Sequence, residues 1–81
     1  MTDFSLTPAQ LRAARGIIKL SARDFAAAAK IAHTTVHRME GGDPAIQAGT
    51  LRLARVEYER RGVEFLEGGW VRLAKDSVAD G

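Results

Sequence analysis

Two short helical patterns, separated by only three residues, most constrain the fold of this chain. The first spans residues 22–29, is rich in alanine and follows Ser21, a residue type that caps helix N-termini. The second spans residues 33–40 and ends at a Gly-Gly pair, which commonly terminates a helix. Residues 30–32 interrupt the apolar periodicity between the two patterns. Two short helices joined by so tight a turn predict a helix-turn-helix.

Two further helical patterns flank this unit. The pair Thr7-Pro8 is a typical helix start, with Thr as the N-cap and Pro at the first helical position, and it predicts a helix over residues 8–19. Thr50 is another candidate N-cap and predicts a helix over residues 51–61, which Gly62 ends. The chain is therefore expected to be mainly α, with four to five short helices.

The segment 63–73 is expected to form a C-terminal β-hairpin, because two short strand-like runs flank a glycine-containing turn. A two-residue turn at Gly68-Gly69 would mix polar and apolar side chains on both faces. A three-residue turn beginning at Glu67 instead collects one wholly apolar face, which consists of Val63, Phe65, Val71 and Leu73. We therefore predict the three-residue turn, with Gly69 in the left-handed conformation.

The opposite face of this hairpin carries Leu66 and Trp70, which are candidate dimer contacts because an exposed Trp is otherwise unexplained. The alternative is that Trp70 folds back onto the helix over residues 51–61. A two-stranded hairpin is marginally stable alone, and a cysteine-free chain of 81 residues has no disulfide to support it, so a homodimer is expected. One domain is predicted over residues 1–73, followed by a flexible tail over residues 74–81.

The net charge of +2 is unevenly distributed. Residues 1–40 hold six basic and three acidic side chains and both histidines, whereas residues 41–81 hold six basic and seven acidic ones. A polyanion would therefore approach the N-terminal half of the chain. Residues 52–61 intersperse Arg with Glu, which is typical of a solvated helix face.

Several classes of protein do not fit the sequence. No apolar run approaches the roughly 18 residues that span a bilayer, and the N-terminus lacks a signal-peptide pattern, so a cytoplasmic protein is expected. The chain has no Ser-His-acid spacing, no Gly-rich phosphate loop after a strand and no paired carboxylates in a predicted pocket. We therefore expect neither an enzyme nor a cofactor.

The second helical pattern of the helix-turn-helix directs a polar side outward, formed by His33, Thr34, His37 and Arg38. Such a helix fits the major groove of DNA, where Arg can donate two hydrogen bonds to guanine and Thr can contact several bases. Histidine can contact either a base or a phosphate. His33 and His37 are spaced to share a metal ion, but no third ligand is evident, so no metal site is expected. The alternative for Arg38 is an ordinary solvated position.

In these features the chain resembles the Cro/CI–Xre class of bacterial and phage helix-turn-helix regulators. The resemblance covers about residues 11–42 and depends on Leu11, Arg15, Leu20-Ser21, Phe25-Ala26, Ile31, Thr35-Val36 and Met39-Glu40-Gly41. It implies a lambda-repressor-like fold and a nucleoid-associated transcription regulator, a repressor rather than an activator. Such a regulator would bind an inverted-repeat operator in double-stranded DNA as a homodimer.

The resemblance also implies roles for matching positions. The residues that would face the bases are His33, Thr34, His37 and Arg38. Thr35 would lie nearer the DNA backbone. Arg15 would pair with Glu40 and hold the recognition helix to the domain, because partly buried opposite charges satisfy each other.

The chain departs from the family pattern in several places. Ala22 replaces the usual Gln, which leaves the neighbouring Arg23 as a candidate phosphate contact. Lys30 replaces the Gly of the turn, and Ala32 replaces the polar N-cap of the next helix. The loop at residues 43–45 is acidic where basic residues are common, so it would repel phosphate. These departures keep a second function open, that of a protein-binding adaptor or antitoxin-like module on the same fold.

Overall fold

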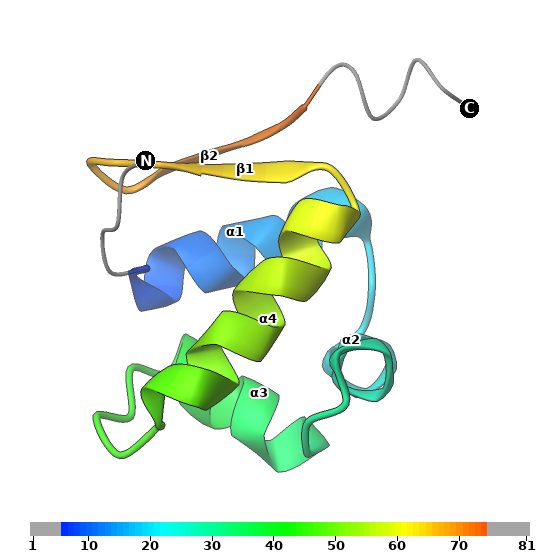
Figure 1. The fold of residues 1–81 in the computed structure, drawn as a ribbon, viewed down its shortest axis with the longest axis vertical. Helices are drawn as coiled ribbons and strands as arrows, with labels where there is room; N and C mark the ends of the chain where they lie inside the picture. Colours follow the sequence, from blue (N-terminus) through cyan, green and yellow to red (C-terminus); the bar gives the residue numbers. More distant parts are fainter. Residues whose placement is uncertain (1–5, 75–81) are drawn as a thin grey trace.

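The computed structural model describes residues 6–74 and is drawn in Figure 1. Its elements, in chain order, are α1 (Pro8–Ile18), α2 (Ala22–Ala29), α3 (His33–Glu40), α4 (Ala48–Arg60), β1 (Val63–Leu66) and β2 (Trp70–Leu73). Four helices followed by an antiparallel two-stranded hairpin confirm the predicted mainly α fold class for the described residues. Apart from Ala74, the tail predicted over 74–81 lies outside the described residues. None of the described helices is long and apolar enough to cross a membrane.

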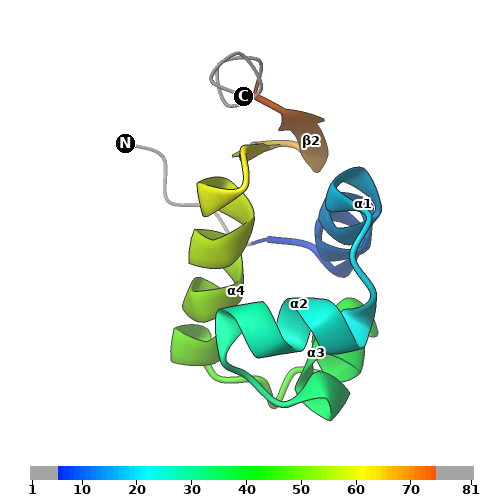
Figure 2. The same ribbon diagram turned by 90° about the vertical axis from the view of Figure 1, so that its right-hand side faces the viewer.

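Helix α4 runs from one end of the molecule towards the other, as the two views in Figure 1 and Figure 2 show. The hairpin covers one end, where it packs on α1 and α4. Helices α2 and α3 pack against each other at the opposite end. The outward surfaces of the hairpin and of α3 are therefore separated by the length of the domain, which leaves each of them available for a different contact.

Three aromatic rings join the helices to the hairpin in the core. Phe25 of α2 stacks on Tyr58 of α4 with ring centroids 4.1 Å apart, and Tyr58 meets Phe65 of β1 edge-on at 5.9 Å. Such pairs contribute about 0.5–1.5 kcal/mol each beyond the area they bury. Burial, followed by the charge of Glu40, raises the pKa of the Tyr58 hydroxyl above its ordinary value. Through these three rings, α2 at one end of the domain is packed continuously, via α4, to the hairpin at the other end.

The predicted N-caps of the first two helices are confirmed. The Thr7 hydroxyl accepts a hydrogen bond of 3.0 Å from the backbone N–H of Gln10, and the Gln10 side chain accepts one of 2.9 Å from the backbone N–H of Thr7. This reciprocal pair is a capping box. The Ser21 hydroxyl likewise accepts from the backbone N–H of Asp24 at 3.0 Å.

The start of α4 differs from the prediction. The helix begins at Ala48 rather than residue 51, and its N-cap is Gln47, which makes no side-chain cap hydrogen bond. Thr50 instead lies inside the first turn, and its backbone N–H donates to the Gln47 carbonyl at 3.1 Å. Ile46 packs against the core immediately before the helix, and its packing outweighs a Thr cap, which is worth only about 1 kcal/mol. The other helix boundaries lie within one residue of the predicted positions.

The hairpin has the predicted register, in which a three-residue turn places Leu66 opposite Trp70 and Phe65 opposite Val71. Gly69 has the expected positive φ of 92°, and Gly68 shares it at 94°. The inner face is buried at Val63 and Phe65, whereas Leu73 at its end remains 45% exposed. Trp70 is 70% exposed, so the alternative in which it folds back onto the last helix is wrong for this structure.

The buried side chain of Gln10 connects the start of α1 to the hairpin. Gln10 is only 1% exposed, and its Nε2 donates to the backbone carbonyls of Leu66 and Trp70, each at 3.0 Å. Its Oε1 is occupied by the Thr7 N–H of the capping box. Because every polar atom of this buried amide has a partner, its desolvation is offset, and the closed end of the hairpin is held on α1.

Candidate nucleic-acid interface

The turn between α2 and α3 keeps its tight geometry despite an unusual residue. Lys30 adopts the left-handed conformation at φ 63°, a region that costs a side-chain-bearing residue about 1–2 kcal/mol. Its backbone N–H and that of Ile31 both donate to the carbonyl of Ala26, which closes the end of α2. Helix α3 then begins after Ala32, which supplies no side-chain cap. Lys30 and Ala32 therefore leave the path of the chain intact, with some cost in stability.

Helix α3 separates its side chains into an inner and an outer face. Val36, Met39 and Glu40 are buried against the rest of the domain. Of the residues predicted to contact DNA, those on the exposed side are Thr34, His37 and Arg38, while His33 and Thr35 are half-buried. The structure thus brings five of the six predicted residues together on one helix, and the sixth, Arg23, is exposed on the adjacent α2.

The ion pair implied between Arg15 and Glu40 is present. Arg15 Nε and Nη2 donate to the two carboxylate oxygens of Glu40 at 2.6 and 2.9 Å, and Nη1 donates to the Leu20 carbonyl at 3.2 Å. The hydrogen bond from Glu40 raises the pKa of Arg15, so this guanidinium stays charged. Arg12 adds a bond of 2.6 Å from its Nη1 to the backbone carbonyl of Glu40. Two arginines of α1 thereby hold the C-terminal end of α3.

A second ion pair lies on the exposed side of α3. Arg38 Nε donates to Asp43 Oδ2 at 2.7 Å, and the Arg38 side chain remains 52% exposed. Asp43 Oδ1 accepts from the backbone N–H of Ala45 at 2.8 Å. The pKa of Asp43 is lowered first by the Ala45 N–H and then by Arg38, so the carboxylate is charged at neutral pH. The Asp43 carboxylate, which we expected to repel phosphate, therefore has two hydrogen-bond partners within the protein, Arg38 and the Ala45 N–H.

The two histidines of α3 contact each other rather than pointing apart. Their rings meet edge-on, with centroids 5.4 Å apart. Within residues 6–74, no group of three or more His, Cys, Asp or Glu side chains is arranged to hold a metal ion. His33 and His37 are thus neighbouring polar groups on α3, and His37 precedes Arg38 directly in the chain.

The charged side of α4 differs from the solvated face predicted for it. Glu57 is only 7% exposed and accepts hydrogen bonds from both Arg60 and Arg61, at 2.7 and 2.6 Å respectively. The bond from Arg60 is the largest cause of a lowered pKa at Glu57, with Arg61 acting in the same direction. Arg55 similarly binds the exposed Glu59 at 3.0 Å. Most of this basic charge is therefore paired with acidic groups of the same helix.

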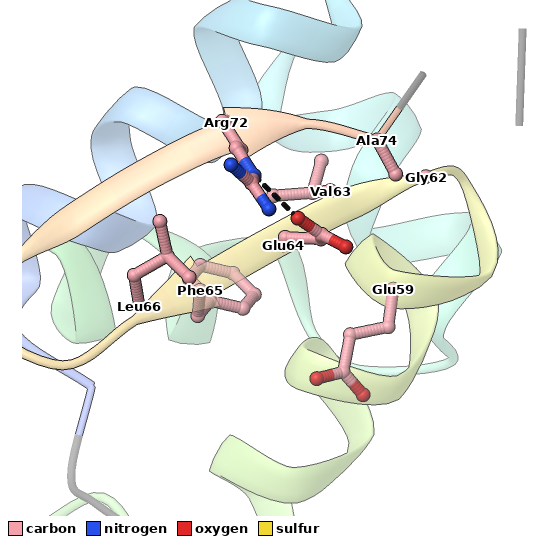
Figure 3. A pocket seen from close by; sticks show the side chains of 8 residues that line it. All are labelled: Glu59, Gly62, Val63, Glu64, Phe65, Leu66, Arg72 and Ala74. Carbon is pink, nitrogen blue, oxygen red and sulfur yellow. Dashed lines mark hydrogen bonds and ion pairs between the residues drawn. The ribbon is translucent and has the colours of Figure 1, made fainter. Parts of the chain in front are cut away.

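A pocket of about 440 Å³ lies at the other end of the molecule, beside the hairpin and the end of α4 (Figure 3). It is lined by Glu59, Gly62, Val63, Glu64, Phe65, Leu66, Arg72 and Ala74. Its charged groups have partners, because Arg72 binds Glu64 across the strands and Glu59 binds Arg55. No residue of α3 lines this pocket, which is separate from the candidate interface.

No protein family model matches the chain, and no curated protein matches it either. The residues of this chain and their geometry are therefore the basis for assigning a function.

Three residues make contacts that the sequence patterns did not predict, namely Asp43 and Arg12 beside the candidate interface and Gln10 beneath the hairpin. Gln10 had a usable signal, since Thr7 and Gln10 have the spacing of a capping box, although its bonds to the hairpin have no local signature. The loop at residues 43–45 was expected to be acidic, but the pairing of Asp43 with Arg38 across the Gly-Gly segment was not expected. The bond from Arg12 to a carbonyl at the end of α3 depends entirely on how the two helices pack.

Proposed function

We propose that the protein is a sequence-specific DNA-binding transcription regulator in which α3 enters the major groove. The observation that carries the proposal is the row of exposed polar side chains at Thr34, His37 and Arg38 on a short helix that follows a three-residue turn. These residue types can donate to base edges and phosphates, and Arg is the commonest specific partner of guanine. Arg23 on α2 would contact a flanking phosphate.

The way α3 is held supports this role. Arg15 and Arg12 bind its C-terminal end from α1, while Val36 and Met39 are buried beneath it. A helix that reads base edges must keep its side chains in register with the groove, and contacts made by a rigid element are more selective than those made by a loop. The charge excess in residues 1–40 adds a long-range attraction for a polyanion on the same half of the chain.

A homodimer is part of this proposal. Trp70 and Leu66 form an apolar pair on the outer face of the hairpin, and Trp70 is 70% exposed. A second copy would remove this surface from water. Reading an inverted repeat would further require the two α3 helices to lie in successive major grooves about 34 Å apart. Repression is the simpler outcome, because occupying an operator suffices to exclude another protein from it.

The proposal is tested by selecting duplexes from a random library with the wild-type protein and measuring their affinity at two salt concentrations. Arg38→Ala should weaken the selected site by about 1–3 kcal/mol and relax the preference at one base pair of each half-site. Arg72→Ala is the matched control, since Arg72 is also exposed and also bonds a carboxylate through Nε, but lies on the hairpin. Unchanged affinity and preference in Arg38→Ala would contradict the proposal.

The second candidate function is a protein-binding adaptor or antitoxin-like module. The observation that favours it is the exposure of large apolar side chains outside α3, with Leu53 and Val56 on α4 at 49% and 56% in addition to Trp70. Size-exclusion chromatography combined with DNA-shift assays separates the two functions. A stable complex with another protein, together with no duplex shift even at low salt, would favour the adaptor.

A further inference from the structure

Asp43 is bound to Arg38 through both its backbone and its side chain. The Asp43 backbone N–H donates to the Arg38 carbonyl at 3.0 Å, which brings the loop back onto the last turn of α3. The Asp43 carboxylate then accepts from Arg38 Nε at 2.7 Å. The exposed arginine of the candidate interface is therefore contacted at two points by one residue of the following loop.

The Asp43 carboxylate is fixed by the loop as well as by Arg38. Its Oδ1 accepts from the Ala45 N–H two residues on, a turn that Asp commonly forms with its own backbone. Pro44 between them has a restricted φ, which limits the conformations of this turn. The carboxylate has a side-chain exposure of 30%, less than the 52% of Arg38. The Asp43 carboxylate is thus a partly buried, fixed acceptor beside the more exposed guanidinium of Arg38.

The geometry of this bond determines which part of Arg38 remains available. The bond uses Nε, the guanidinium nitrogen nearest the aliphatic stem. A guanidinium is planar, so a hydrogen bond at Nε orients the whole plane, including the two terminal Nη groups. Those groups form the fork that donates simultaneously to O6 and N7 of guanine.

We propose that Asp43 is a positioning residue that orients Arg38 for end-on recognition of a guanine in the major groove. This inference rests on the proposed DNA-binding function and adds the base that Arg38 selects. An arginine held before binding loses less side-chain freedom when it meets the base. The carboxylate also disfavours other arrangements of Arg38, such as a move to a neighbouring phosphate. Asp43 therefore increases discrimination between bases rather than overall affinity.

A simple shielding role for Asp43 predicts a different result. A carboxylate that only neutralised Arg38 would weaken binding to every DNA sequence equally, because phosphate attraction carries no base information. Removing the charge would then strengthen binding uniformly. The two roles are separated by measuring base preference at a single position, which general electrostatics does not alter.

The experiment begins with the duplex selected by the wild-type protein and locates the base pair whose preference disappears in Arg38→Ala. Asp43→Asn keeps the size of the side chain and an oxygen that can accept from Ala45, but it removes the charge that holds Arg38. We expect the preference for guanine at that position to fall about tenfold, with preferences elsewhere in the site retained. Glu64→Gln is the matched control, because it makes the same change of charge at the Nε-bonded Arg72 of the hairpin.

Two companion variants make the result specific. Arg38→Lys keeps the positive charge without the planar fork, so we expect it to lose the same preference. In Arg38→Ala, adding Asp43→Asn should cause no further change in base preference, because the arginine to be positioned is gone. Thermal unfolding of each variant, monitored by circular dichroism, establishes that the fold is intact before binding is measured.

Each outcome has one interpretation. If wild type selects a site and Asp43→Asn binds all sequences more tightly with unchanged guanine preference, Asp43 is a shield and the inference is wrong while the proposed function stands. Unchanged affinity and preference in Asp43→Asn overturn the inference in the same way. If wild type selects no sequence and shifts no duplex at low salt, the proposed function fails and the inference fails with it.

Discussion

Arg15 in α1 and Glu40 at the end of α3 form a two-pronged ion pair, with guanidinium–carboxylate hydrogen bonds of 2.6 and 2.9 Å. The side chain of Glu40 is only 8% exposed and that of Arg15 only 26%, so water competes weakly for either. The pair lies beneath the helix that carries the candidate DNA contacts. It couples the stability of the domain to the position of that helix.

The first prediction concerns this pair. Glu40→Gln should lower the free energy of unfolding by about 1–3 kcal/mol, because the poorly hydrated Arg15 guanidinium would lose its charged acceptor. Glu64→Gln is the control, since Glu64 and its partner Arg72 both have exposed side chains, at 44% and 66%, and exposed pairs contribute about 0–1 kcal/mol. Urea unfolding measures both values. Equal destabilisation by the two substitutions would mean that burial does not strengthen the Arg15–Glu40 pair.

The second prediction concerns the attachment of the hairpin. Gln10→Ala should destabilise the protein by about 1–3 kcal/mol, because it removes both donors to the Leu66 and Trp70 carbonyls and opens a small void. Gln47→Ala makes the same substitution at an exposed N-cap without a side-chain cap bond and should change stability by about 0.5 kcal/mol or less. Hydrogen exchange in β1 and β2 should accelerate in Gln10→Ala alone. Exchange that stays slow would show that the apolar face holds the hairpin without this amide.

The third prediction concerns self-association. Trp70→Ala should shift the protein from dimer to monomer, because the large exposed ring is the main apolar group on the outer face of the hairpin. It should scarcely change the stability of the monomer, since a ring that is 70% exposed contributes little to the core. Sedimentation equilibrium over a range of concentrations measures the association. Val56→Ala, at another exposed apolar position, should leave the dimer intact, and a dimer that survives Trp70→Ala argues for a different interface.

The fourth prediction concerns acid. Hydrogen bonding by Arg60, aided by Arg61, lowers the pKa of Glu57 in the folded state below its ordinary value of 4.5. A lowered folded-state pKa means that the native state binds fewer protons than the unfolded state near and just below that value. The resulting stabilisation is fully present at neutral pH and is lost as pH falls from the ordinary pKa through the lowered one.

The expected loss of stability in acid is checked by comparing the urea unfolding of wild type and Glu57→Gln at pH 7, 5 and 3. The amide introduced by this substitution does not titrate, so the variant should lose less stability than wild type between pH 5 and pH 3. The difference between the two proteins should therefore narrow as the solution becomes acidic. A difference that is constant with pH would contradict a lowered pKa at Glu57.

Local structure was largely predictable, because its causes lie within a few residues. Thr7 and Ser21 cap helices through backbone N–H groups three positions later, and both interactions are present. The hairpin register followed from side-chain alternation, since a shift of one residue would have exposed Phe65 and buried Glu64. Lys30, which stands where the resembled family has the Gly of the turn, adopts the left-handed conformation.

The errors arose where a local preference competed with packing. Thr50 is a good N-cap residue, yet α4 starts at Ala48, shortly after Ile46, whose side chain packs against the core. Glu57 was expected on a solvated helix face, but it is only 7% exposed and pairs with Arg60 and Arg61, three and four residues later. The burial of Glu57 depends on how α4 packs against the domain, whereas its ion pairs are local contacts within one helical turn.

The sequence by itself determined the order of helices and hairpin, the helix caps and which side of α3 is polar, because backbone hydrogen bonding and periodicity act over a few residues. Only the tertiary structure decided that Trp70 stays exposed, that Gln10 binds the hairpin and that Arg38 meets Asp43. These outcomes depend on which surfaces the packed helices leave open and which polar atoms they bring within hydrogen-bond distance. Such distances are set by the packing of the whole core, to which residues far apart in the chain contribute together.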